Sequence, residues 1–506
     1  MASSALCALS GVLYFLGFLS FDLFPLAWIC FVPVLYAVRN ATTRQAFAYG
    51  AVFGTITNAG GFYWVVHVIV AFGRLPVAVA VLGFLLLCVY QGLLLAIVLA
   101  AVRYADRRLG LAPVWSLPVA LVTLEWLYPL LFPSFIGNSQ FRFSALTQIV
   151  EITGMLGLTA LIGLANGAVY ELLEAKRAAR VVGYSRVVVP AGVFALCIAY
   201  GSLRLPSVEA TALAAPTTRV AIVQTNIGGQ KKESDPTGFL QAHIRTSKEA
   251  LAADPAIDLL VWPEAVYDHI VHKRNGAITD KIGLGLDKPV ILGTLSMAET
   301  NGNGPTEYFN TVALVAPDGS VLGSFDKVEL LAFGETPPLL DRLPALRAWL
   351  SDAAWFSRGK SFRNLQLDEI SLLPMICYED IIPSLVRKIW RRAGPADALV
   401  NVTNDSWYGD TAEPMIHLAL SSFRSIETRR ALIRSTNTGI SAVIDPAGRV
   451  VQRTGQWTKD VLVVDVPLIR DRSSTLYMRA GDVLGWIAAG LVLLSLYRAR
   501  SSNSRD

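Results

Sequence analysis

Eight long apolar runs occupy the first 200 residues and the end of this 506-residue chain. Each approaches the roughly 20 apolar residues that a helix needs to cross a bilayer. Charged residues make up only 16% of the chain, against about 25% in a typical soluble protein. We therefore expect a membrane protein with eight spanning helices, near residues 4–20, 23–38, 46–72, 76–102, 111–132, 147–172, 187–203 and 481–497.

The basic residues of the short loops predict the orientation of these helices, because Lys and Arg accumulate on the cytoplasmic side of a membrane. Twelve of them follow the second, fourth, sixth and eighth runs, whereas the alternate loops carry little more than Arg74 and Arg142. Both termini are thus expected in the cytoplasm, and the long segment after the seventh run is expected outside it. The twelve are Arg39, Arg44, Arg103, Arg107, Arg108, Lys176, Arg177, Arg180, Arg186, Arg498, Arg500 and Arg505.

Between the seventh and eighth runs lies a segment of globular composition. It alternates short β-branched runs with amphipathic stretches, which is typical of an α/β layered domain. We expect three regions: seven membrane helices in residues 1–205, an α/β domain in residues 218–468 and a last membrane helix in residues 481–497.

Strands and helices of the α/β domain can be placed from these runs. Turn sequences at 317–320 and 445–448 lie between strand-like runs and predict two hairpins, so the sheet is expected to be mixed rather than purely parallel. Expected strands are 220–224, 258–262, 290–294, 311–316, 321–325, 372–377, 398–402, 441–444 and 461–466, and expected helices are 237–252, 272–285, 381–391 and 414–431.

Cys377 is the one cysteine of the globular segment, and the other four cysteines lie inside apolar runs. In an oxidising compartment it has no second cysteine in its domain with which to pair. Glu264 and Lys327 occur in the same segment. Together these three residues could form a catalytic site for nucleophilic attack on a carbonyl. The carboxylate would take the thiol proton, the thiolate would attack and the ammonium would stabilise the oxyanion.

The predicted strands place Glu264, Lys327 and Cys377 just past strand ends, where open α/β sheets usually carry their chemistry. Cys377 would also begin a helix, whose amide dipoles favour a thiolate. Each residue has a plainer interpretation: a small buried core cysteine, an exposed turn carboxylate and a surface lysine after a hairpin.

Other function classes find little support in the sequence. The net charge of +5 comes without a cluster of basic and aromatic residues, so nucleic-acid binding is not indicated. The five histidines have no metal-ligand spacing, and we expect neither a metal nor a cofactor. Glu125 and Glu151 fall within apolar runs, where an ionisable group is costly and usually has a partner or a water-filled cavity.

Several short motifs in this order resemble a known family. The globular segment is similar to the nitrilase superfamily of carbon-nitrogen hydrolases, and the whole chain resembles the apolipoprotein N-acyltransferase family of bacterial inner membranes. The motifs are Trp262-Pro263-Glu264, Phe333-Gly334-Glu335, Ser357-Arg358-Gly359, Ile376-Cys377-Tyr378-Glu379, Asn404-Asp405-Ser406-Trp407-Tyr408-Gly409 and Arg434-Ser435-Thr436-Asn437-Thr438-Gly439-Ile440.

This resemblance implies an αββα sandwich of the nitrilase type and roles for eight residues. Glu264 would be the general base, Lys327 the oxyanion stabiliser and Cys377 the nucleophile. The resemblance further implies a supporting carboxylate at Glu335, neighbours important for activity at Tyr378 and Glu379, an asparagine of the family pattern at Asn310, and a lipid-facing loop residue at Trp407.

The sequence departs from the family pattern in its substrate-facing loops. Glu233 or a neighbouring lysine stands where a tryptophan is expected after the first strand, and Ala332 replaces a proline. Met415 and Ile416 replace a tryptophan-glutamine pair before His417. These departures concern lipid contacts and leave the proposed chemistry in place.

The resemblance implies acyl transfer from a glycerophospholipid, through a thioester, to the α-amino group of a diacylglyceryl-cysteine at an apolipoprotein N-terminus. The partners would be these two lipids and the bacterial inner membrane, with the α/β domain in the periplasm and the chain acting as a monomer. Two other functions stay open: a membrane-anchored amidase or nitrilase for a small soluble substrate, and a catalytically inactive envelope scaffold.

Overall fold

The computed structural model describes residues 2–19, 21–228, 234–298, 306–331, 335 and 356–503. Glu233 and Ala332, two of the departures from the family pattern, lie outside these residues, as do Phe333 and Gly334. The chain divides into two compact units, each described here by itself. The helical unit contains Met1–Pro206, Thr411–Leu420 and Thr475–Asp506, and the sandwich unit contains Ser207–Asp410 and Ser421–Ser474.

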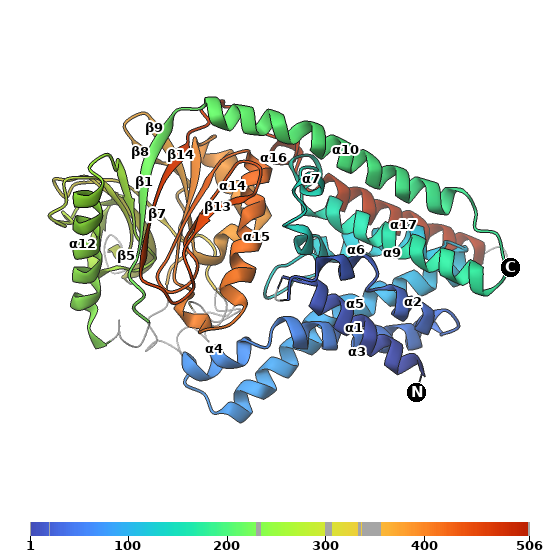
Figure 1. Cartoon of the computed structure of the whole chain (residues 1–506). Coiled ribbons are helices and arrows are strands. Elements are labelled where there is room, and N and C mark those ends of the chain that lie inside the picture. Colours follow the sequence, from blue (N-terminus) through green and yellow to red (C-terminus); the bar gives the residue numbers. More distant parts are fainter. Residues whose placement is uncertain are drawn as a thin grey trace. The chain divides into compact units, whose positions relative to one another are not determined.

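The helical unit is a bundle of apolar helices (Figure 1). Helices α3 and α5 pack closely, and a Cβ on Gly54 would lie 2.3 Å from the carbonyl oxygen of Gly92. Small residues let membrane helices approach this closely. The main helices are α1 (Ala2–Gly17), α2 (Val32–Val38), α3 (Thr43–Gly61), α4 (Val65–Ala71), α5 (Val77–Leu109), α6 (Pro113–Leu127), α9 (Met155–Arg177), α10 (Ser185–Ala214, which ends in the sandwich unit) and α17 (Val483–Asn503).

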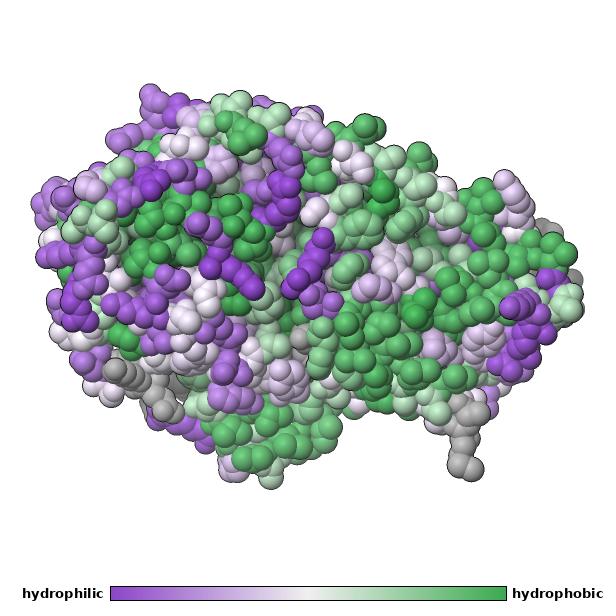
Figure 2. Space-filling model, in the orientation of Figure 1, coloured by the Kyte–Doolittle hydropathy of each residue, from purple (hydrophilic) through white to green (hydrophobic). Residues whose placement is uncertain are grey.

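Large apolar side chains lie exposed on the outer faces of these helices (Figure 2). Leu86 on α5 is 62% exposed, Leu196 on α10 is 71% exposed and Trp486 on α17 is 69% exposed. A soluble protein rarely exposes apolar surface on this scale, so these faces fit contact with lipid.

The predicted count of eight spans is not confirmed. Within the described residues, three helices are long and apolar enough to cross a membrane: α5, α9 and α10. A fourth span results if α3 and α4, which are bent by 58°, count as one. Four more apolar segments, Ser3–Gly17, Phe24–Val38, Pro113–Leu127 and Val483–Arg498, are shorter than a full span. The apolar helices therefore fit a transmembrane protein, whereas the number of crossings remains a prediction.

The two carboxylates that fall within apolar runs, Glu125 and Glu151, both have partners. Glu125 accepts a hydrogen bond from the backbone N–H of Ile136 at 2.9 Å and another from the hydroxyl of Thr159. Glu151 pairs with Arg204 at 2.7 Å. Such pairing offsets the cost of placing a carboxylate in apolar surroundings, and Glu125 thereby ties α6 to the short turn η2 (Ile136–Gln140).

The sandwich unit consists of two mixed β-sheets with helices on their outer faces (Figure 1). The first sheet has the order β14-β1-β2-β5-β3-β4, with β6 and β7 continuing antiparallel from β5. Its strands are β1 (Thr217–Gln224), β2 (Leu259–Val261), β3 (Tyr267–Arg274), β4 (Ala277–Ile278), β5 (Val290–Ala298), β6 (Glu307–Val315), β7 (Val321–Asp326) and β14 (Asp460–Pro467).

The second sheet has the order β13-β12-β11-β10-β9-β8. The side chain of Gln224, on β1, accepts hydrogen bonds from Thr436, Ser441 and Thr454, so polar contacts join the two sheets. Its strands are β8 (Leu365–Leu367), β9 (Ile370–Ile376), β10 (Ala398–Thr403), β11 (Leu432–Thr436), β12 (Ala442–Ile444) and β13 (Val450–Arg453), and the helices of this unit are α12 (Pro236–Ala253), α14 (Pro383–Ala393) and α15 (Glu413–Thr428, which begins in the helical unit).

The sequence predicted the mixed sheets and both hairpins correctly, but the helix expected at 272–285 is wrong. This stretch forms the end of β3, the short strand β4 and irregular chain. β3 pairs in parallel with β5, so sheet pairing overrides the amphipathic pattern of its polar residues. Asn275 and Gly276, both with positive φ, form the turn between β3 and β4, and this Asn-Gly pair was a hairpin signal in the sequence.

Candidate active site

Strand ends position the three residues that the sequence singled out. Glu264 lies three residues after β2, Lys327 directly follows β7, and Cys377 directly follows β9. All three side chains are buried in the sandwich unit, with 6%, 2% and 5% of their surfaces exposed. The expected positions at strand ends are therefore confirmed, and the plainer readings of Glu264 and Lys327 as exposed residues are wrong.

Lys327 lies between two carboxylates. Its Nζ is 2.8 Å from Oε1 of Glu335 and 3.4 Å from Oε1 of Glu264. The side-chain amide of Asn310 donates to the same two oxygens, at 3.0 Å and 2.6 Å respectively. Burial favours the neutral amine, but the charges of Glu264, Cys377 and Glu335 together outweigh it and raise the pKa of Lys327 well above its usual value.

The two oxygens of Glu264 have different surroundings. Oε1 carries the contacts to Lys327 and Asn310, whereas Oε2 is buried and has no hydrogen-bond partner among the described residues. A buried oxygen without a partner is costly, so it often marks a group that acts on a substrate or a proton. Oε2 is thus the oxygen of Glu264 that is available to accept a proton.

Cys377 begins the five-residue 3-10 helix η4 (Cys377–Ile381) and has a φ of 53°. Few residues other than glycine adopt this conformation, which recurs at functional sites where the surroundings enforce it. Asn401, on β10, donates its side-chain amide to the carbonyl oxygen of Cys377 at 2.8 Å. The neighbouring strand therefore holds the turn that carries the thiol.

Burial raises the pKa of the Cys377 thiol well above its usual value, and the charge of Glu264 adds to this effect. Lys327 and a hydrogen bond with Thr403 act in the opposite direction but are weaker. The helix that Cys377 begins is the short 3-10 helix η4, and the desolvation of the buried thiol outweighs the groups that favour a thiolate. A thiol with a raised pKa has to lose its proton to a base before it can act as a nucleophile.

Glu379 fixes the backbone on both sides of the site. One of its oxygens accepts from the backbone N–H groups of Val328 and Glu329, at 2.7 and 3.0 Å, and the other accepts from Ile376 at 2.9 Å. It thus links the segment after Lys327 to the residue before Cys377. Burial raises the pKa of Glu379 to about 7, although these three N–H groups favour the ionised carboxylate.

Tyr378 lies beside this connection. Its hydroxyl donates to the carbonyl oxygen of Leu330 at 3.2 Å, and its ring faces Lys327 Nζ at 5.9 Å from the ring centre. Gly359, the last residue of the Ser357-Arg358-Gly359 motif, donates its N–H to the carbonyl oxygen of Lys327 at 2.7 Å. Tyr378, Glu379 and this motif therefore all help to position the lysine.

Sequence reasoning missed two positioning residues, Asn401 and Gly293. Asn401 interrupts the apolar run of the buried strand β10, and this amide between valines was its signal. A Cβ on Gly293, in β5, would lie 2.5 Å from Cα of Glu264 and 2.3 Å from the backbone nitrogen of Ala265. Only glycine lets β5 pass this close to the segment that carries Glu264.

A buried ion-pair network lies next to the turn that begins at Cys377. Arg434, on β11, pairs with Asp380 of η4 at 2.9 Å and with Asp405 at 3.0 Å, and all three side chains are fully buried. Asp405 begins η5 (Asp405–Tyr408), the short helix that carries Trp407, which is 41% exposed. The Arg434 and Asp405 motifs therefore connect η4 to the segment that was expected to face lipid.

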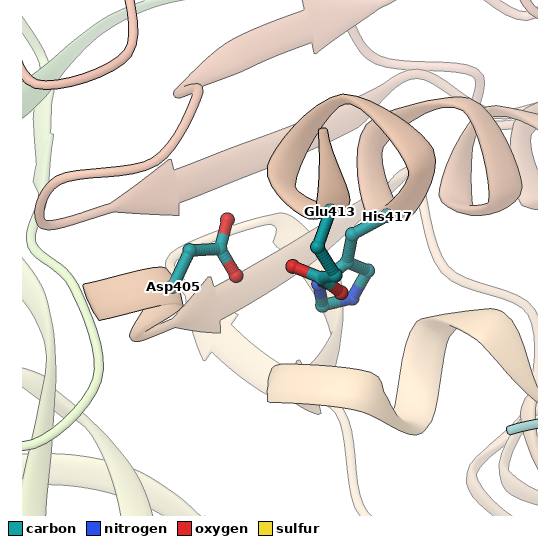
Figure 3. Close-up of side chains that lie close together, drawn as sticks. All are labelled: Asp405, Glu413 and His417. Atoms are coloured by element: carbon teal, nitrogen blue, oxygen red, sulfur yellow. Dashed lines mark ion pairs between the residues drawn. The ribbon is translucent and has the colours of Figure 1, made fainter. Parts of the chain in front are cut away.

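Met415 and Ile416, where the chain departs from the family pattern, lie in the first turns of α15. In the same turns Nδ1 of His417 is 3.9 Å from Oε1 of Glu413 (Figure 3). Asp405, also drawn there, belongs to the sandwich unit and is the partner of Arg434. The expected absence of a metal remains a prediction.

Comparison with known proteins decides the family. Residues 10–168 match the Apolipoprotein N-acyltransferase N-terminal domain, and residues 219–473 match the Carbon-nitrogen hydrolase family. An apolipoprotein N-acyltransferase of Geobacter metallireducens is 34% identical over 98% of this chain and 95% of its own length. The chain belongs to the apolipoprotein N-acyltransferase family. It is thus an acyltransferase with a nitrilase-like carbon-nitrogen hydrolase fold in its C-terminal half.

Other members of the apolipoprotein N-acyltransferase family match over the same extent. The protein of Bdellovibrio bacteriovorus is 28% identical over 98% of this chain and 94% of its own length. Among solved structures, Nit3 of Saccharomyces cerevisiae, a nitrilase-superfamily member, is 16% identical over 50% of this chain and 90% of its own, with a TM-score of 0.38. The resemblance that the motifs suggested is confirmed by the curated relatives and the two family matches.

Proposed function

We propose that this chain transfers an acyl group from a glycerophospholipid to the α-amino group of a diacylglyceryl-cysteine at an apolipoprotein N-terminus. The observation that carries the proposal is the buried cluster of Glu264, Lys327 and Glu335 in the sandwich unit, where Cys377 also follows a strand end, in a chain of this family. We propose the same three regions as the sequence predicts, with residues 218–468 in the periplasm and both termini in the cytoplasm.

The first half-reaction forms an acyl-enzyme. Oε2 of Glu264 takes the proton of the Cys377 thiol, and the thiolate attacks the ester carbonyl of the phospholipid. Lys327 and backbone amides hold the tetrahedral oxyanion, and Glu335 and Asn310 keep Lys327 in place. Collapse breaks the ester bond, and Glu264 passes its proton to the leaving alkoxide. A lysophospholipid is released, a thioester is left on Cys377 and Glu264 is again ionised. The raised pKa of the thiol explains why a neighbouring base is required.

The second half-reaction moves the acyl group to the acceptor amine. The α-amino group attacks the thioester, and Glu264 takes a proton from the attacking nitrogen. The carbon–sulfur bond breaks, Glu264 passes the proton to the leaving Cys377 thiolate, and the N-acylated lipoprotein is released. No metal or other cofactor takes part in this cycle, and the proposed acting species is a monomer.

Water must be kept from the thioester between the two half-reactions. We place Trp407, exposed on η5, in the loop that covers the acyl chain. Trp407→Ala is then expected to raise the share of acyl groups lost to hydrolysis, measured as free fatty acid against N-acylated lipoprotein. An unchanged ratio of transfer to hydrolysis would remove Trp407 from this role.

Intact-protein mass spectrometry after incubation with phosphatidylethanolamine tests the proposal. Wild-type protein should gain the mass of one acyl chain, which hydroxylamine removes, and Cys377→Ser should gain none. A reactive thiol without an adduct would favour the membrane-anchored amidase, and undiminished lipoprotein acylation by Cys377→Ser would favour the inactive scaffold.

A further inference from the structure

Four exposed basic residues lie on α14 and on the segment before β8 of the sandwich unit. Lys388, Arg391 and Arg392 lie on the solvent side of α14, whose opposite side buries Leu385, Val386, Ile389 and Trp390. Arg363 precedes β8. We call these four residues, Arg363, Lys388, Arg391 and Arg392, the basic face.

The ring of Phe362 brings the two segments together. Nζ of Lys388 lies 5.2 Å from the centre of this ring, and the guanidinium of Arg392 lies 4.7 Å from it. Arg363, the next residue in the chain, is therefore held beside α14. Within the described part of the chain, none of the four residues of the basic face forms an ion pair.

A local structural role explains only part of this cluster. Arg391 and Arg392 lie in the last turn of α14, where cations stabilise the helix dipole. Lys388 lies before that turn, and Arg363 lies outside the helix, so the dipole accounts for neither. Unpaired like charges that share one surface repel each other, and an anionic partner would remove this cost.

The basic face is fastened to the part of the chain that leads to the last apolar helix. Nε1 of Trp390, on α14, donates to the hydroxyl of Ser474 at 2.9 Å. Arg472 donates to the carbonyl oxygen of Pro395, just after α14, at 2.6 Å. The apolar helix α17 begins at Val483, nine residues after Ser474 in the sequence. An α17 inserted in a bilayer would thus tether the basic face to the membrane surface.

We propose that the basic face is a docking surface for the anionic phospholipid headgroups of the bilayer. The proposal rests on the outward placement of the sandwich unit in the proposed function. Basic residues near a membrane surface attract anionic lipids, and the attraction falls off within the Debye length. Docking through phosphate-bearing headgroups would hold the sandwich unit in one orientation to the lipids on which it acts.

The test uses the full chain in nanodiscs with Cys377→Ser as the background, so that its outcome does not depend on acyl transfer. An environment-sensitive fluorophore is attached at Ser384→Cys, an exposed position at the start of α14. Its quenching by headgroup-labelled lipid is compared between phosphatidylcholine and an equimolar mixture with phosphatidylglycerol. We expect stronger quenching in the anionic bilayer, and we expect high salt to remove the difference.

Two variants and one control make the test specific. Lys388→Ser/Arg392→Ser should lower the preference for the anionic bilayer by on the order of tenfold. Arg363→Ser/Arg391→Ser should do the same without touching the Phe362 contacts. The matched pair Arg245→Ser/Lys248→Ser, exposed on α12, should leave it unchanged. The proposal would be overturned if quenching were equal in the two bilayers. It would also be overturned if the control pair lost as much of the preference for the anionic bilayer as the basic-face variants, or if quenching of the fluorophore responded only to an acidic lipoprotein segment.

Discussion

At the scale of single residues, the site depends on side chains that hold backbone in place. Asn401→Ala removes the hydrogen bond to the carbonyl oxygen of Cys377 and frees a turn that is held at a positive φ. We expect acyl-enzyme formation to slow on the order of tenfold while phospholipid binding is unchanged, because the thiol loses its orientation rather than its substrate. Rapid-mixing mass spectrometry of the thioester measures the rate.

Asn364→Ala is the matched control for this change. The amide of Asn364 also donates to a backbone oxygen, that of Gly394 at 3.1 Å, but it lies apart from Cys377 in the chain and makes none of the described contacts of the site. Equal slowing in the two variants would show that general destabilisation, and not the orientation of Cys377, is responsible.

Glu379 should give the protein a pH dependence that Glu379→Gln lacks. Burial raises the pKa of Glu379 from 4.5, its ordinary value, to about 7 in the folded protein. Between these pH values the folded state therefore holds a proton that the unfolded state has released. The contribution of Glu379 to the free energy of unfolding is fully present below pH 4.5 and is lost as the pH rises through 7. The total change is roughly 3 kcal/mol. Thermal unfolding of both proteins across this range measures it.

The comparison with Glu379→Gln isolates this effect from other titrating groups. The variant keeps the side-chain shape but points an amide N–H at one of the three backbone N–H donors, and two donors cannot pair. Its free energy of unfolding at low pH should therefore be lower than that of the wild-type protein. The difference between the two proteins should then narrow toward pH 7. Parallel curves would mean that Glu379 does not change its protonation over this range.

At the scale of elements, the close approach of β5 to the segment after β2 sets the position of Glu264. Gly293→Ala would push a methyl group into Cα of Glu264 and the nitrogen of Ala265. We expect acylation to fall about a hundredfold, because the base moves away from the thiol, together with a destabilisation of about 1–3 kcal/mol. Thioester formation and thermal unfolding report the two effects.

Gly283→Ala is the control at a position where an added Cβ meets no atom within 4 Å. It changes the same residue type without changing a contact, and both readouts should stay near wild type. Normal acylation in Gly293→Ala would show that the segment shifts without moving the carboxylate of Glu264.

The elements also show what a sequence can and cannot predict here. Glu264, Lys327 and Cys377 were identifiable because each polar residue follows a short β-branched run, and their recognition gained from motifs that occur in order. For β3 the sequence signal was the Asn-Gly turn at its end, and the pattern of its polar residues did not indicate a strand, because its pairing with β5 is a long-range contact. The contacts of Asn401 and Gly293 likewise depend on which strands become neighbours, which periodicity within a segment does not reveal.

At the scale of the whole molecule, the distribution of basic residues predicts opposite sides for Lys459 and Arg108. Lys459 lies in the sandwich unit and Arg108 near the end of α5, and both are exposed in their own units. With the native cysteines replaced, Lys459→Cys should react with a membrane-impermeant maleimide in spheroplasts, whereas Arg108→Cys should react only after permeabilisation. Gel shifts measure the labelling, and the reverse pattern would invert the proposed topology.

The protonated thiol of Cys377 has a consequence for the lifetime of the molecule. Peroxide and thiol-disulfide exchange attack the thiolate, so a cysteine that ionises only beside a poised base presents little reactive sulfur while no substrate is bound. In an oxidising compartment, such an enzyme would lose activity to cysteine oxidation only slowly between turnovers. It would need no dedicated reductant to restore the thiol. The same burial that raises the pKa of the Cys377 thiol would therefore protect it from oxidation.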